Sequence, residues 1–133
     1  MVFLIISVRS VKLYGIGGQV NRYLKGKEEM RTIRFVENWG GKLDKKVFTT
    51  IRRSDEEKKE YYVGSLNEIF QVKLKGKDYC KATLCGIWYG KFEDITAEIL
   101  TEDTGLPLDK SLILFNRFRC LGNNVIILTF QVD

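Results

Sequence analysis

Two segments with strictly alternating polarity constrain the fold of this chain most. Every second side chain is apolar in residues 70–74, and the same alternation returns in residues 80–84 after a Lys-Gly-Lys-Asp turn. A period of two is typical of a strand with one buried face. Strands joined by so short a turn pair antiparallel. The pattern therefore predicts an antiparallel hairpin and argues against a doubly wound parallel sheet. Gly86 interrupts the alternation, and we expect a β-bulge there.

Further strands are predicted on both sides of this hairpin. We expect Ile33 and Phe35 to point inward from one of them. The charged segment 54–60 is predicted to be a solvated turn, with residues 61–63 pairing back onto the sheet. Aliphatic and aromatic residues typical of strands are concentrated in the segments 2–14, 30–36, 47–53 and 125–132.

The hydrophobic period changes from two to about 3.6 after residue 92. Apolar residues from Phe92 to Leu100 fall on one helical face. Thr104-Gly105 is a plausible end for this helix, and Pro107 is well placed to begin another. A short helix is also predicted over residues 19–25.

The order of these elements indicates an α+β fold. Strand, helix, several strands, two helices and a final strand predict a small mixed β-barrel flanked by short helices. The length of 133 residues suits a single domain covering residues 1–133.

The composition excludes much chemistry. The chain has no histidine, so Ser-His-Asp and Cys-His arrangements and histidine-based metal centres are ruled out. Its three cysteines, Cys80, Cys85 and Cys120, do not make a disulfide framework, and a thiolate zinc site would lack a fourth ligand. We expect free, structural thiols, and we predict no metal and no cofactor.

The apolar start of the chain predicts a buried strand rather than a membrane anchor. Residues 2–8 are too few to span a bilayer, and they lack the flank and cleavage site of a signal peptide. We therefore expect a cytoplasmic protein with no membrane partner. The net charge of +5 permits attraction to nucleic acid or to an anionic metabolite.

One tripeptide occurs twice, as Thr32-Ile33-Arg34 and as Thr50-Ile51-Arg52. Each copy lies in a predicted strand, so Thr and Arg share one face and Ile takes the other. With Ile turned inward, a hydroxyl and a guanidinium are presented together, which suits a phosphate or an RNA backbone. A chance match between good strand formers is the alternative explanation.

Basic and aromatic residues near this tripeptide form a candidate nucleic-acid-binding set. The arginines would contact phosphates and the lysines would flank them, unless the lysines only form a solvated loop. The tryptophan could stack on an unpaired base or pack over one end of the barrel. The set consists of Arg34, Trp39, Lys42, Lys45, Lys46, Arg52 and Arg53.

Several motifs in order cover nearly the whole chain. Leu24-Lys25-Gly26-Lys27 is followed by Thr32-Ile33-Arg34-Phe35, by the hairpin, by a helix opening at residues 92–96 and by the strand 125–132. In this the chain resembles the ASCH family, a branch of the PUA-like β-barrels. The resemblance implies a PUA-like barrel associated with RNA, and binding of RNA, a nucleotide or a nucleoside in a basic cleft.

The resemblance also implies alternative activities. The family includes a ribonuclease and small amidohydrolases that deacetylate N4-acetylcytidine. In the amidohydrolase branch, Thr32 would be the nucleophile and Lys27 would activate it. Asp103 or Glu102 would pass a proton to the leaving amine. A further possibility is a nucleoside pocket lined by Tyr61, Tyr62, Trp88 and Tyr89.

Overall fold

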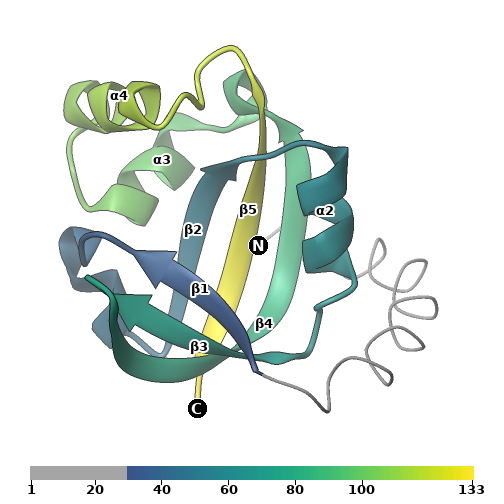
Figure 1. Cartoon of the computed structure of the whole chain (residues 1–133). Helices are drawn as coiled ribbons and strands as arrows, with labels where there is room; N and C mark the ends of the chain where they lie inside the picture. Colours follow the sequence, from purple (N-terminus) through teal and green to yellow (C-terminus); the bar gives the residue numbers. More distant parts are fainter. Residues whose placement is uncertain (1–29) are drawn as a thin grey trace.

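Five strands form one mixed sheet in the order β1-β3-β4-β5-β2 (Figure 1). The computed structural model describes residues 30–133, so the strand and helix expected within residues 2–25 lie outside the described residues. β1 runs parallel to β3, and the other neighbouring pairs are antiparallel. The strands are β1 (Arg31–Phe35), β2 (Val47–Arg53), β3 (Ile69–Leu74), β4 (Lys77–Lys91) and β5 (Asn124–Val132).

The predicted hairpin is confirmed as β3 and β4. The register of β4 against β5 shifts between Leu84 and Gly86, which confirms the expected bulge. The strand expected over residues 47–53 is also confirmed, and Ile33 and Phe35 of β1 are buried as predicted.

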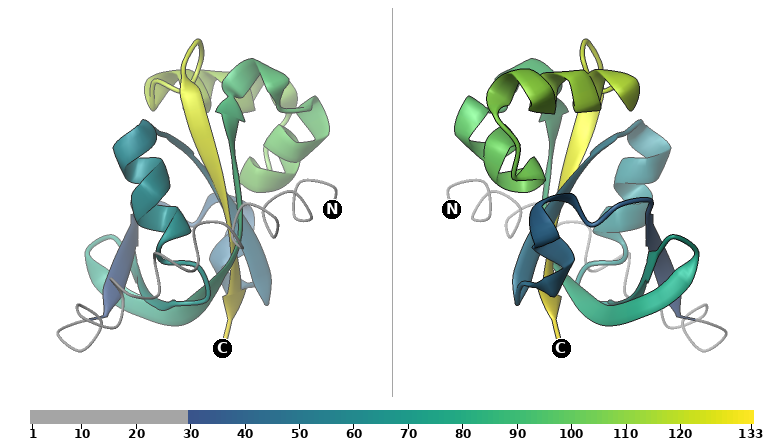
Figure 2. Two further views of the ribbon diagram at one scale, coloured as in Figure 1. Left: turned by 90° about the vertical axis from the view of Figure 1, so that its right-hand side faces the viewer. Right: turned by 90° about the vertical axis from the view of Figure 1, so that its left-hand side faces the viewer.

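Short helices cover both sides of the long strands (Figure 2). α2 lies on one side, and α3 and α4 lie on the other. The helix expected from Phe92 is divided, because a short 3-10 turn precedes α3. The elements are η1 (Trp39–Asp44), α2 (Glu56–Val63), η2 (Phe92–Asp94), α3 (Ala97–Thr104) and α4 (Leu108–Arg117).

The predictions of a solvated turn over residues 54–60 and of residues 61–63 pairing back onto the sheet are wrong, because α2 occupies residues 56–63. The Asp55 side chain accepts a hydrogen bond of 2.8 Å from the Lys58 N–H and caps the helix. Glu56 and Glu57 then lie in the first turn, where carboxylates favour the positive end of a helix. Val63 is the only buried residue of α2, so no apolar stripe marked the helix in the sequence.

The α+β class is confirmed, but the described strands form an open sheet rather than a closed barrel. The sheet ends at β1 on one edge and at β2 on the other, and these two edges are not paired within residues 30–133. A side chain spans the gap instead, since Arg52 of β2 donates a hydrogen bond of 2.7 Å to the Arg34 carbonyl of β1.

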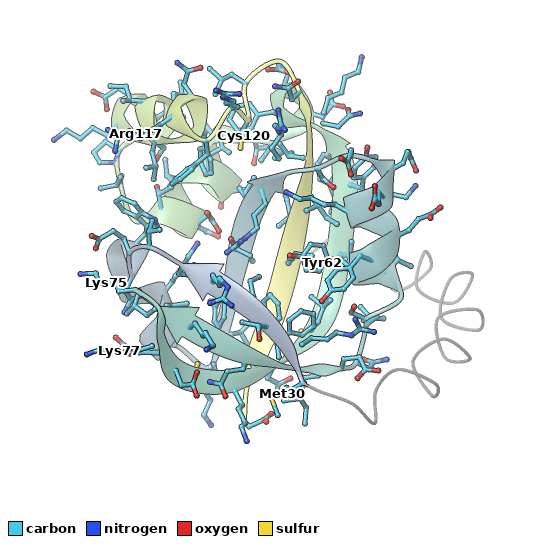
Figure 3. The ribbon with its side chains drawn as sticks, viewed as in Figure 1. Met30, Tyr62, Lys75, Lys77, Arg117 and Cys120 are labelled. Atoms are coloured by element: carbon cyan, nitrogen blue, oxygen red, sulfur yellow. The ribbon has the colours of Figure 1, made fainter. Side chains whose placement is uncertain are left out.

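Two hydrophobic clusters lie on opposite faces of the sheet. The larger one includes Phe35, Phe48 and Phe70, and Tyr62 of α2 packs on it with its ring 6.2 Å from that of Phe70 (Figure 3). The smaller one fills the space between the other face and helices α3 and α4. Its buried members are Ile51, Phe92, Leu100, Phe115, Cys120, Val125 and Ile127.

All three cysteines are free, as the sequence indicated. Cys120 is fully buried (Figure 3), and burial raises the pKa of its thiol to about 11. Burial also raises the pKa of Cys80 and of Cys85. Because the thiolate is the reactive form, these shifts support structural roles. Within residues 30–133, no helix combines the length and the apolar character needed to cross a bilayer.

Gly105 ends α3 with φ of 71°, and its backbone lies close to the backbone of Gly40 in η1. A Cβ at Gly105 would lie 2.8 Å from the Gly40 Cα, so the backbone would have to move. We expect Gly105→Ala to lower the free energy of unfolding by about 2–3 kcal/mol, measured by urea denaturation.

Gly76→Ala is the matched control for this substitution. Gly76 also has a positive φ, 82°, but a Cβ there meets nothing within 4 Å. Gly76→Ala should lower the free energy of unfolding only by the cost of a positive φ for alanine, about 1 kcal/mol. Equal losses in the two variants would contradict the tight contact between α3 and η1.

Candidate functional site

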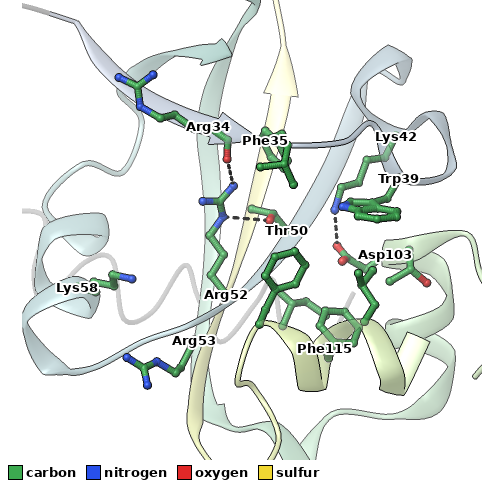
Figure 4. Close-up of a pocket in the computed structure, with 15 residues that line it drawn as sticks. Arg34, Phe35, Trp39, Lys42, Thr50, Arg52, Arg53, Lys58, Asp103 and Phe115 are labelled. Carbon is green, nitrogen blue, oxygen red and sulfur yellow. Dashed lines mark hydrogen bonds and ion pairs between the residues drawn. The ribbon is translucent and has the colours of Figure 1, made fainter. Parts of the chain in front are cut away.

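A cavity of about 360 Å³ opens between the two edge strands of the sheet, η1 and the helices α3 and α4 (Figure 4). This volume is in the range of small-molecule sites, about 300–1,000 Å³. Its walls carry four aromatic side chains: Phe35, Trp39, Phe115 and Phe118.

The closed end of the cavity holds a buried ion pair. Lys42 Nζ lies 3.2 Å from Asp103 Oδ1, and the two side chains are only 6% and 4% exposed. The Thr49 hydroxyl donates to the same oxygen at 2.7 Å. Within residues 30–133, both hydrogen bonds to this carboxylate end on Oδ1, which leaves Oδ2 available to a ligand.

Burial shifts the pKa of both partners toward their neutral forms. Desolvation lowers the pKa of Lys42, and the charge of Asp103 opposes that effect. Desolvation likewise raises the pKa of Asp103, against the attraction of Lys42 and the hydrogen bond from Thr49. Each charge is therefore tolerated in this position because the other is there.

The local structure of η1 explains why Lys42 is buried although it follows two glycines. Gly40 and Gly41 adopt φ of 60° and 68°, which turns the chain tightly inside η1. The Asn38 side chain then accepts a hydrogen bond of 2.9 Å from the Leu43 N–H and holds the turn. Lys42 and Leu43 are the buried residues of η1, so this turn directs the lysine into the cavity.

Arg52 organises the middle of the cavity. Its Nε donates to the Thr50 hydroxyl at 3.2 Å, and a terminal nitrogen donates to the Arg34 carbonyl at 2.7 Å (Figure 4). The guanidinium also lies 4.8 Å from the centre of the Phe35 ring. Burial lowers the pKa of Arg52, but an arginine keeps its charge in proteins. Arg52 therefore fixes the distance between β1 and β2 and places a cation in the cavity.

The open end of the cavity is basic. Arg34, Arg53 and Lys58 line it and are exposed. In the part of the chain that the structure describes, no carboxylate forms an ion pair with any of these three side chains. Uncompensated cations at the rim of a cavity attract anions.

The two Thr-Ile-Arg copies present opposite faces to the interior. In the first copy, Ile33 is buried in the larger cluster, as expected, and Arg34 is exposed. In the second copy, Ile51 belongs to the smaller cluster beneath α3 and α4. All three residues of this copy line the cavity, and Thr50 is buried rather than presented to solvent. The second copy contributes more side chains to the site than the first.

The structure brings many of the predicted site residues together. Lys45, Lys46 and Glu102 are exposed, and they are not among the residues that line the cavity. Lys42 differs from the other two lysines of its loop because it is buried and they are exposed. The predicted site residues that line the cavity are Arg34, Trp39, Lys42, Arg52, Arg53 and Asp103.

The predicted catalytic set is only partly described. Thr32 is half-buried on β1 opposite Gln71 of β3, and it does not line the cavity that Asp103 lines. Lys27 lies outside the described residues. The proposed roles of Lys27, Thr32 and Asp103 in hydrolysis stay predictions.

Sequence reasoning missed several contributors to the site. The charged composition of residues 54–60 predicts a turn at Lys58, whereas the Asp55 cap is the signal that indicates its helix. Phe118, which follows α4 directly, is not among the predicted site residues, yet it lines the cavity and is 45% exposed. Tyr61, Tyr62 and Trp88 line neither this cavity nor a second one beside it, whereas Tyr89 lines the second.

Comparisons with known proteins support the fold. No family model matches the sequence, and no curated protein matches it. Among solved structures, the crystal structure of protein EF3133 from Enterococcus faecalis V583, described by the family model DUF984, is similar with a TM-score of 0.56. The match has 11% sequence identity and covers 95% of this chain and 89% of that one. At this identity the similarity concerns the fold alone.

Proposed function

We propose that the cavity binds a nucleotide, either free or as one unit of an RNA strand. The observation that carries this proposal is a cavity with aromatic walls and, at its rim, cations that form no ion pair within residues 30–133. The base would lie against Trp39 and Phe118, and its phosphate would meet Arg53 and Lys58. Stacking on an aromatic side chain contributes about 1–3 kcal/mol per base. Arginine and lysine at the rim supply charge-assisted hydrogen bonds to phosphate.

The closed end of the cavity favours a polar ring over an apolar one. Lys42 can donate and Asp103 can accept, so together they complement a ring that carries an acceptor beside a donor. Every nucleobase has such an edge. An apolar ring would leave the buried pair without these hydrogen bonds, which is unfavourable.

The motif order in the sequence supports the same proposal. We also propose that the chain is an ASCH-type domain of the PUA-like kind, because residues 24–35 and the later elements resemble that family. That family is associated with RNA, and the charge of this chain has the matching sign.

Tryptophan fluorescence tests the proposal directly. The chain has two tryptophans, Trp39 in the cavity and Trp88 packed against the smaller cluster. Titration with 5′-mononucleotides or short single-stranded RNA at low ionic strength should quench the Trp39 emission. Trp39→Phe should abolish the response, whereas Trp88→Phe should retain it.

A matched pair of charge variants tests the phosphate contact. Arg53→Ala should weaken nucleotide binding by about tenfold, a typical loss for one charge-assisted contact. Lys46→Ala removes the same charge from an exposed position away from the cavity, and it should change affinity by less than about twofold. Absence of binding by all four nucleotides and by RNA, or equal losses in both variants, would contradict the proposal.

A further inference from the structure

A second cavity, of about 410 Å³, lies beside the first and shares two residues with it. Arg53 and Lys58 line both cavities. The two cations therefore stand between the cavities, and a ligand that crosses from one to the other must pass them.

The second cavity differs in chemistry from the first. Its further lining residues are polar or can hydrogen-bond: Ser54, Asp55, Glu56, Tyr89, Asn123 and Asn124. The carboxylates of Asp55 and Glu56 disfavour a second phosphate there. They favour groups that donate hydrogen bonds, such as the hydroxyls of a sugar.

Oxygen acceptors remain available in this cavity. One carboxylate oxygen of Asp55 accepts from the Lys58 N–H and caps α2. Within residues 30–133 the other oxygen has no hydrogen bond. The Asn123 side chain uses its Nδ2 to donate to the Arg119 and Leu121 carbonyls, which leaves Oδ1 as an acceptor.

We propose that the ligand is a ribonucleotide strand of at least two units that occupies both cavities. This inference rests on the proposed function. The base of one nucleotide lies in the first cavity, and the phosphate that links it to its neighbour meets Arg53 and Lys58. The ribose of the neighbour lies in the second cavity, where its 2′-hydroxyl donates to Asp55 or Asn123. This hydroxyl is the group by which a protein distinguishes RNA from DNA.

Binding of matched mono- and dinucleotides tests the inference. The probes are the four 5′-mononucleotides, the four homodinucleotides of RNA and the four of DNA. For the preferred base, the ribodinucleotide should bind about tenfold more tightly than the mononucleotide and than the deoxydinucleotide. Equal affinity for mono- and dinucleotides would overturn the two-cavity proposal while leaving the nucleotide site intact. Failure of every probe to bind would remove the proposed function as well.

Asp55→Asn tests the role of the sugar without removing the helix cap. Asparagine caps helices about as well as aspartate, so its amide oxygen can keep the bond to the Lys58 N–H. The cavity then faces an amide N–H₂ donor in place of a carboxylate oxygen. We expect the ratio of ribo- to deoxydinucleotide affinity to fall, and to approach one only when Asn123, the alternative acceptor, is replaced as well.

Glu57→Gln is the control for the lost charge. Glu57 lies in the same first turn of α2 but lines neither cavity. This variant should keep the ribose preference of the unaltered chain. A ribose preference that survives Asp55→Asn and Asn123→Ser together would overturn the assignment of the second cavity to the sugar.

Discussion

Lys42→Ala should lower the free energy of unfolding by about 3–5 kcal/mol, the typical loss when one partner of a buried ion pair is removed. The reason is that Asp103, 4% exposed, would lose the cation that compensates its charge in a buried site. The Thr49 hydroxyl would be the only remaining hydrogen-bond donor to that carboxylate within residues 30–133. Urea denaturation followed by circular dichroism measures the loss.

The double variant Lys42→Met/Asp103→Leu separates charge from packing. It removes both charges and keeps apolar volume, so it should be far more stable than Lys42→Ala, and comparable to the unaltered chain within about 1–2 kcal/mol. Lys45→Ala, at an exposed lysine of the same loop, should change stability by less than about 0.5 kcal/mol. If Lys42→Ala were as mild as Lys45→Ala, the buried ion pair would be refuted.

Arg52→Lys should lower the free energy of unfolding by about 2 kcal/mol although it conserves the charge. A lysine carries its donors on one terminal nitrogen, so it does not reproduce the two separate arginine nitrogens that bond Thr50 and the Arg34 carbonyl. The β1 edge would lose its connection to β2. Hydrogen exchange of the β1 amides should accelerate more than that of the central strand β5.

Arg53→Lys is the matched control, since it is the same substitution one residue further along β2. Arg53 is exposed at the rim, and its replacement should change stability by less than about 0.5 kcal/mol. Similar losses in both variants, or unchanged exchange at β1, would show that Arg52 does not connect the sheet edges.

Local pattern was sufficient for the strands and their partners in the hairpin. Alternation in residues 70–84 identified β3 and β4, because a strand with one buried face has an apolar side chain at every second position. The bulge at Gly86 was also readable, because that residue interrupts the alternation. The helix end at Gly105 was readable because a positive φ favours glycine. α2 was missed, because its apolar residues form no stripe and the Asp55 cap alone marked its start.

The candidate site was less accessible to the sequence than the fold. Arg34, Arg52, Arg53 and Trp39 were singled out by residue type, and all of them line the cavity. The pairing of Lys42 with Asp103 could not be predicted, because the two residues are 61 positions apart and meet only when α3 packs on η1. The closure of this contact depends on Gly40 and Gly105 approaching each other.

The repeated tripeptide shows what the sequence determines and what only the tertiary structure decides. The sequence determined that Thr and Arg share one face of each strand and Ile the other, because alternation is a property of the strand itself. Only the tertiary structure decided which face is inside. Helices α3 and α4 cover Ile51 in the smaller cluster, and Thr50 and Arg52 line the cavity. Burial depends on what covers each face, and those covering elements are distant in the chain.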